Sequence, residues 1–278
     1  MTPHETIDAS FAERFGETVD VPLDTTGLEV LAGIARRRVH RRYTERPVDP
    51  ALIRLLCACA LSAPSKSDLQ QRDIVVVTDT ALRSSIAELL PRTPCVREAP
   101  AFLVFCANAA RIRKVSEWRG KPFPNDHLDL FFNAVGDASI ALATCLIAAE
   151  AVGLGGCPIS EIRNYAAKVS DWLALPEQVI PFAGLCLGWP QEAGQISPRL
   201  PLALTVHENV YSERDLRETL AAYDRRREAL QPYAVQYQVD RWGRSAEYGW
   251  TEQKARQYAV PQRTDFGEFV RRKRLKLE

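Results

Sequence analysis

Hydrophobic and polar positions along the chain predict helices that alternate with short strands. Leu28, Leu31 and Ile34 recur at helical spacing, so a short helix is expected there. Asp49-Pro50 is typical of a helix start, with Asp as the N-cap and Pro in the first turn. Apolar runs of the kind found in buried strands occupy residues 74–77, 101–106 and 180–187.

Residues 128–152 form a long segment with hydrophobic side chains on nearly every side of the predicted helix. Such a helix must be buried on most faces, inside the protein or against a partner subunit. The glycines at 153, 155 and 156 end it and leave room for close backbone approach. The order of elements predicts an α+β fold, in which helices flank a small mixed β-sheet around a long central helix.

The two ends of the chain differ in character from its middle. Residues 1–27 are polar and aperiodic, which predicts an N-terminal arm. Residues 212–278 are charged and poor in strand signals, with one helix expected near 213–230. We therefore expect one domain at 28–211, and a C-terminal extension at 212–278 that wraps over a subunit or partner.

Composition is that of an ordinary soluble globular protein: 46% of the 278 residues are hydrophobic, 26% are charged and the net charge is +1. This balance argues against nucleic acid as a partner. We expect no secretory signal and no membrane span, because the apolar stretch 138–149 is too short to cross a bilayer. Seven cysteines in mainly apolar surroundings indicate reduced thiols in the cytoplasm. His40 and His127 have no partner at metal-ligand spacing, so no metal site is expected.

The most distinctive polar feature is a cluster of five arginines within residues 36–42. Their mutual repulsion is relieved by an anion, and guanidinium forks suit phosphate oxygens. Residues 63–70 follow, rich in hydroxyls and turn formers that can bind a polar ligand edge. The two segments favour a small phosphorylated ligand, and a solvated basic turn is the alternative.

Four runs of sequence resemble the FMN-dependent nitroreductase family in order and spacing. They are RRRVHRRYTERPV, SAPSKSDLQ, AAEAVGLGGCPIS and GLCLGWPQEAGQISPRLP. The match covers roughly residues 28–211 and is closest to the NADPH-preferring nitroreductase and flavin-reductase branch. The resemblance implies a nitroreductase-like fold and a homodimer, whose long central helices pack against each other with FMN in the interface.

The resemblance also implies a set of cofactor-binding residues. Three arginines would hold the FMN phosphate and ribityl chain, a fourth would reach the phosphate from the far side, and hydroxyl and amide groups of the other subunit would meet the flavin. A further segment would border the ring near its reactive N5. In chain order these residues are Arg37, Arg38, Val39, Arg41, Ser65, Lys66, Ser67, Gln70, Pro158, Ile159, Ser160, Glu161 and Arg199.

Three positions depart from the family pattern. Val39 stands where the family usually has Ser, and Ser197 where a Lys is common. Ser160-Glu161 replaces a pair that contains glycine, which could change the N5 hydrogen bond or narrow the substrate space.

The function implied is an FMN-dependent NAD(P)H oxidoreductase. Hydride would pass from NADPH or NADH through flavin N5, in a ping-pong cycle, to a small-molecule acceptor such as a nitroaromatic, a quinone or free flavin. No catalytic side chain is required, because the cofactor carries the hydride. Two alternatives stay open: a reductive dehalogenase or flavin-fragmenting enzyme of the same fold, and a non-catalytic protein that binds flavin or a nucleotide.

Overall fold

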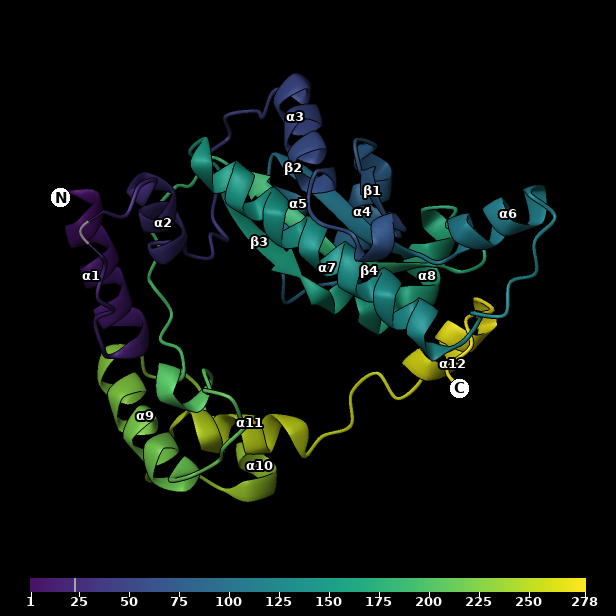
Figure 1. Cartoon of the computed structure of the whole chain (residues 1–278). Coiled ribbons are helices and arrows are strands. Elements are labelled where there is room, and N and C mark those ends of the chain that lie inside the picture. The colour runs from purple at the N-terminus through teal and green to yellow at the C-terminus, as the bar shows by residue number, and fades with distance from the viewer. Residues whose placement is uncertain (23) are drawn as a thin grey trace. The chain divides into compact units, whose positions relative to one another are not determined.

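The computed structural model describes residues 1–22 and 24–278, which fall into two compact units (Figure 1). Unit 1 consists of Met1–Arg38 and Gln195–Gln262, and unit 2 of Val39–Gly194 and Arg263–Glu278. These units follow spatial contacts rather than chain order. The division expected from the sequence, at 27/28 and 211/212, stays a proposal.

Unit 2 is built on a four-stranded sheet in the order β1-β2-β4-β3. Its strands are β1 (Arg72–Val76), β2 (Ala101–Asn108), β3 (Gly155–Ile159) and β4 (Val179–Gly188). Within the part of the chain that the structure describes, each neighbouring pair is antiparallel, where a mixed sheet was expected. The sheet and its surrounding helices confirm the α+β class.

Two of the expected strands are confirmed with slightly wider bounds, as β2 and β4. The strand expected at 74–77 begins earlier, as β1, and was wrongly predicted to be buried. It lies at the sheet edge, where Arg72 is its one buried residue and Val76 is 39% exposed. The strand β3 was not predicted, because two glycines and a proline among its five residues speak against a strand. It forms as an edge strand paired with β4, where Pro158 is tolerated.

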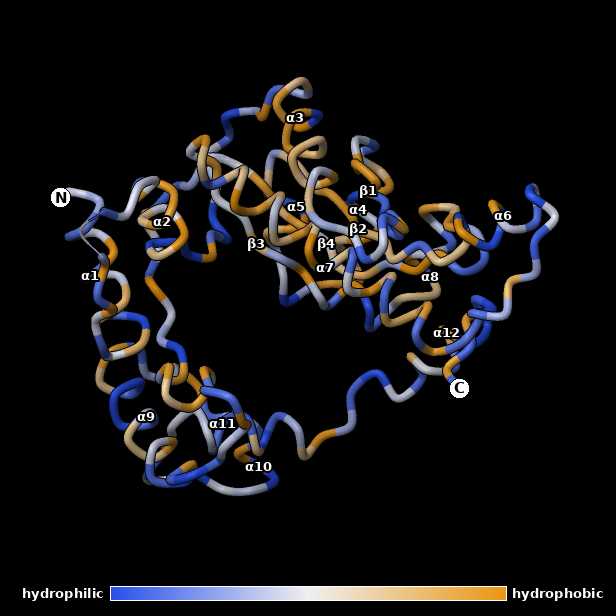
Figure 2. Tube along the Cα trace, viewed as in Figure 1, coloured by the Kyte–Doolittle hydropathy of each residue, from blue (hydrophilic) through white to orange (hydrophobic). Residues whose placement is uncertain are grey.

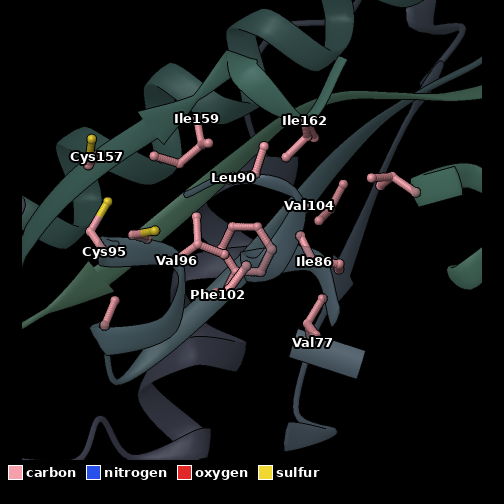
Figure 3. Packing of buried hydrophobic residues seen from close by; sticks show 14 of the residues in the cluster. Val77, Ile86, Leu90, Cys95, Val96, Phe102, Val104, Cys157, Ile159 and Ile162 are labelled. Atoms are coloured by element: carbon pink, nitrogen blue, oxygen red, sulfur yellow. The ribbon is translucent and has the colours of Figure 1, made fainter. Parts of the chain in front are cut away.

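Alternate residues of β2 point to opposite faces of the sheet. Phe102, Val104 and Cys106 belong to one apolar cluster, which is completed by α4, α5 and η2 (Figure 3). Leu103 and Phe105 belong to the cluster formed with α3 and α7. The sheet is therefore covered on both faces, in agreement with the almost continuous burial of β2 and β4.

The helices of unit 2 vary widely in length. They are α3 (Pro50–Leu61), η1 (Lys66–Asp68), α4 (Thr80–Leu89), α5 (Cys95–Glu98), α6 (Ala110–Trp118), α7 (Leu128–Ala151), η2 (Ser160–Tyr165), α8 (Ala166–Trp172) and α12 (Phe266–Arg272). The predicted N-cap of α3 is confirmed, since the Asp49 side chain accepts a hydrogen bond from the backbone N–H of Ala51 at 2.7 Å.

The helix α7 is the predicted long apolar helix, with apolar residues along most of its length (Figure 2). By length and composition it could cross a membrane. In the fold it packs against α3 and the strands of unit 2, and nine of its residues are buried. Its other side carries exposed apolar side chains, including Phe132 at 72% exposure. The sequence predicted that α7 would be buried on most faces, and apolar side chains on both its buried and its exposed side agree with that prediction.

Unit 1 is helical in all its described elements. They are α1 (Pro3–Phe15), α2 (Leu28–Ala35), η3 (Leu202–Leu204), α9 (Leu216–Leu230), α10 (Val239–Trp242) and α11 (Trp250–Tyr258). The aperiodic arm expected over 1–27 is wrong for α1. Thr2 and Glu5 form a capping box, and Ile7 is buried against α2. The helix expected near 213–230 is confirmed as α9.

Candidate functional site

A buried carboxylate on α7 fixes the segment that follows α3. Asp137 is only 2% exposed. Its side chain accepts hydrogen bonds from the Ser65 hydroxyl at 2.7 Å and from the backbone N–H groups of Lys66 at 3.3 Å and Gln71 at 2.8 Å. A charge among apolar residues requires such donors, because burying it unpaired is costly. Asp137 therefore sets the course of the 65–71 loop.

Arg72 supplies the positive charge that balances Asp137. Its Nη1 lies 3.7 Å from Asp137 Oδ2, and the two side chains are only 4% and 2% exposed. The same guanidinium donates to the carbonyls of Leu61 at 2.9 Å, Ala63 at 2.5 Å and Pro64 at 2.8 Å. The ion pair thus ties the end of α3 and the loop to the central helix.

The loop holds an unusual backbone conformation. Ser67, Asp68 and Gln70 have φ values of 49°, 56° and 50°. This left-handed region costs a non-glycine residue about 1–2 kcal/mol, so the loop depends on its hydrogen bonds. The Ser65 hydroxyl supports it by accepting the Gln70 N–H at 2.8 Å. The side chains of Lys66, Ser67 and Gln70 are left exposed and able to donate to a ligand.

The segment that leaves β3 presents only some of its predicted residues outward. Pro158 and Ser160 are exposed, whereas Ile159 is 3% exposed and packs into the core (Figure 3). The Glu161 carboxylate accepts a hydrogen bond from the Thr93 hydroxyl. Pro158 and Ser160 are therefore the side chains of this segment best placed to border a ligand.

Residues 40–43 lie beside β3. The His40 N–H donates to the carbonyl of Gly156 at 3.2 Å, and the Tyr43 hydroxyl donates to the carbonyl of His40 at 2.6 Å. A Cβ on Gly155 would come within 2.6 Å of the His40 ring, so only glycine allows this approach. The exposed Arg41 is carried by this segment. The predicted close approach at the glycine turn is confirmed.

Three thiols form a buried group next to Arg41. A hydrogen bond with Cys95 and burial raise the pKa of Cys157, and the positive charge of Arg41 acts in the opposite direction. The hydrogen bond with Cys157 lowers the pKa of Cys95, but a second one with Cys186 and burial raise it, to about 12 overall. Val39 packs against the same cluster. These thiols are core residues, and the Val39 side chain adds to that core.

The remaining predicted arginines belong to unit 1. Arg37 and Arg38 are half-buried and Arg199 is exposed. Arg14 of α1 links two of them: its Nη2 donates to the Arg37 carbonyl at 2.6 Å, and its own carbonyl accepts the Arg199 N–H at 2.7 Å. Two arginine-bearing segments more than 150 residues apart in sequence are therefore joined within this unit.

Each unit thus brings together part of the predicted site. In unit 2, Arg41 lies beside the segment at 157–161, and the loop at 65–70 is held by α7. The sequence reasoning missed Asp137, Arg72 and Arg14. Asp137 had a usable signal, because a lone acidic residue within an apolar helix must find a buried partner.

The chemistry of these donors fits FMN. Guanidinium groups can hold a phosphate, while exposed ammonium, hydroxyl and amide groups can bind the polar edge of a ring. Over residues 1–22 and 24–278, no three His, Cys, Asp or Glu side chains are grouped to hold a metal ion.

Comparison with known proteins places the chain among α+β flavin and nitro reductases. It is 38% identical over 200 residues to the oxygen-insensitive NADPH nitroreductase of Salmonella typhimurium, covering 71% of this chain and 79% of that protein. It is 30% identical over 244 residues to the FMN reductase (NADPH) of Bacillus subtilis, covering 86% and 95%. The structure of the NADPH:FMN oxidoreductase from Vibrio harveyi complexed with NAD+ is similar at a TM-score of 0.76 and 29% identity, covering 88% and 97%.

Two family models match the chain directly. The model described as "Nitroreductase family" matches residues 34–189, and "Nitroreductase family, C-terminal domain" matches residues 197–278. The chain belongs to the nitroreductase family, and the resemblance seen in its four sequence runs is confirmed.

Proposed function

We propose that this chain is an FMN-dependent NAD(P)H oxidoreductase that reduces nitroaromatics, quinones or free flavin. Family membership and the names of its relatives support this activity and favour NADPH as the donor. The observation that carries the proposal is the joining of the Arg37 and Arg199 segments through Arg14, because two converging guanidinium-bearing segments suit a phosphate.

The protein residues bind and orient rather than react. Arg37, Arg38, Arg41 and Arg199 hold the phosphate and the ribityl chain. The exposed side chains of Lys66, Ser67 and Gln70 donate to the polar part of the ring, and Pro158 and Ser160 border its reactive edge. Val39, Ile159, Ser65 and Glu161 shape the site through the core and loop contacts described above. Bound FMN supplies the hydride chemistry that no side chain here provides.

A homodimer formed through α7 completes the proposal. Leu128, Phe132, Ile140 and Ile147 leave apolar surface on the outer side of this helix, with exposures of 47%, 72%, 42% and 40%. An exposed apolar stripe of this kind marks an association surface. The enzyme would act in the cytoplasm, where its seven free cysteines stay reduced.

An anaerobic titration tests the function. The purified protein should be yellow after incubation with FMN, and NADPH should bleach the absorbance of the oxidised flavin. Adding a nitrofuran or a quinone should restore the colour, whereas a halogenated phenol that alone did so would favour the dehalogenase alternative. A protein that stays colourless with FMN would overturn the proposal.

A matched pair of variants locates the site. Arg199→Met should weaken FMN retention, and Arg54→Met should not, because Arg54 is an exposed arginine on α3. Equal retention by both variants would contradict the role given to Arg199.

A further inference from the structure

Arg14 occupies an unusual position for an arginine. It is only 8% exposed, and its guanidinium lies between two segments that carry predicted phosphate ligands. Its Nη2 donates to the carbonyls of Ala35 at 3.1 Å and Arg37 at 2.6 Å, and its Nη1 to the carbonyl of Ser197 at 3.4 Å. One side chain therefore fastens the end of α2 to the 197–199 segment.

The 197–199 segment is held through each of its residues. The Ser197 carbonyl accepts from Arg14, and the Pro198 carbonyl accepts from the hydroxyl of the buried Tyr223 at 3.2 Å. The Arg199 N–H donates to the carbonyl of Arg14 at 2.7 Å, and the Arg199 carbonyl accepts from Nη2 of Arg226 at 2.9 Å. With its backbone fixed this way, the exposed Arg199 side chain starts from a defined point.

Arg226 closes the same network from α9. It donates to the carbonyls of Glu13 at 3.1 Å and Arg14 at 2.9 Å, at the end of α1. The helix stops at Gly16, with φ +82°, where an added Cβ would lie 2.9 Å from the Arg226 side chain. A cation at the C-terminal end of a helix is favourable, because free carbonyls gather there.

The helix α1 lies outside the residues that the two family models match, 34–189 and 197–278. Arg14 therefore lies outside both matched ranges.

We propose that Arg14 and Arg226 are positioning residues, which fix the backbones of Arg37 and Arg199 so that both guanidinium groups meet the FMN phosphate. The proposal rests on the FMN site of the proposed function. Preorganisation matters because a ligand that must also order the backbone carrying its arginines loses part of its binding free energy, and a backbone that is anchored beforehand avoids this cost. The effect should therefore appear for ligands that carry a phosphate.

The test compares FMN with riboflavin, which has the same ring and no phosphate. Dissociation constants are measured for the full-length apoprotein by quenching of flavin fluorescence, for Arg14→Met, Arg14→Lys and Arg226→Met. Arg225→Met is the matched control, since Arg225 is the exposed neighbour on α9. Arg14→Met and Arg226→Met should weaken FMN binding about tenfold and leave riboflavin binding unchanged. Arg14→Lys should stay weakened, because an ammonium cannot span three carbonyls as a planar fork does.

The outcomes separate this inference from the function beneath it. Equal weakening of FMN and riboflavin would reduce Arg14 and Arg226 to a general structural role, and wild-type FMN affinity in both Met variants would also overturn the inference. Wild-type FMN affinity in Arg14→Lys would show that the positive charge of Arg14 suffices, and would overturn its role as a planar fork that anchors the backbone. If Arg14→Met does not fold, the FMN and riboflavin affinities of Arg226→Met and Arg14→Lys test the proposal instead. A wild-type protein that binds FMN no better than riboflavin, or Arg37→Met and Arg199→Met variants with normal FMN affinity, would instead defeat the proposed FMN site.

Discussion

The hydroxyl of Ser65 donates a hydrogen bond of 2.7 Å to Oδ2 of Asp137, a residue 72 positions further along the chain. The same hydroxyl accepts the Gln70 N–H, so its donor is used on α7 and an acceptor site is used within the loop. Ser65 therefore shapes the loop, while the side chains of Lys66 and Ser67 are exposed. Ser65 was predicted from the sequence to contact a ligand, and in the structure its hydroxyl holds the conformation of the loop.

Removing the negative charge of Asp137 should loosen this loop. In Asp137→Asn, Arg72 keeps a buried charge without its partner, and the amide NH2 faces groups that are themselves donors. We expect a loss of about 3 kcal/mol in the free energy of unfolding, measured by urea denaturation, and weaker FMN binding. Glu117→Gln, at an exposed position on α6, should cost less than about 0.5 kcal/mol. If Asp137→Asn also lost less than about 0.5 kcal/mol in the free energy of unfolding, the Arg72–Asp137 pair would not stabilise the fold.

A charge placed on the outer side of α7 should weaken the proposed dimer. Phe132 is 72% exposed in the single chain, and burying such a side chain contributes about 1.5–3 kcal/mol. Phe132→Glu should raise the dimer dissociation constant by at least about tenfold, as measured by sedimentation velocity over a range of concentrations. Lys114→Glu, on the exposed side of α6, should leave it unchanged. A monomeric wild-type protein would refute the assembly.

The buried thiols should react slowly with disulfide reagents. The pKa of Cys95 is raised to about 12 and that of Cys157 is also raised, so at pH 8 a fraction on the order of 10⁻⁴ of Cys95 is thiolate. Cys57 and Cys59 are half-buried and should account for the fast phase of labelling in the native protein. The variant C57S/C59S should label only on unfolding, and rapid labelling of it would place a reactive thiol at the surface.

The ion pairs of Asp126 should make stability depend on pH. Burial raises the pKa of this carboxyl, but hydrogen bonds from Arg113 and Lys276, the latter at 3.1 Å, lower it below its ordinary 3.8. A lowered pKa contributes stability above the unfolded value, and this is lost as pH falls through the folded value. Asp126→Asn should thus be less stable by about 1 kcal/mol at pH 7. The gap in urea midpoint should narrow as the pH falls below 3.8 and through the lower pKa of the folded state. If the difference in urea midpoint between the wild type and Asp126→Asn did not change with pH, the charge of Asp126 would not be its cause.

Local patterns were enough to predict several elements. The Asp49-Pro50 start of α3, the strands β2 and β4 and the helix α7 carry signals within their own residues, namely a cap, a run of apolar side chains or helical periodicity. Most of the predicted site residues came from the four sequence runs, which are local as well. Even α1 had such a signal in its Thr2–Glu5 capping box, but the helix was not predicted because its apolar face is weak.

What sequence alone determined is therefore the class of the fold, its central helix, its family and the presence of a cluster of cationic residues. The tertiary structure decided which of those residues face outward and what holds them. Strand β3 exists because β4 pairs with it, the loop conformation depends on Asp137, and Arg37 and Arg199 meet through Arg14. These relations depend on contacts between residues far apart in the chain, and the free energy of such a contact is set by burial and geometry that no short window of sequence contains.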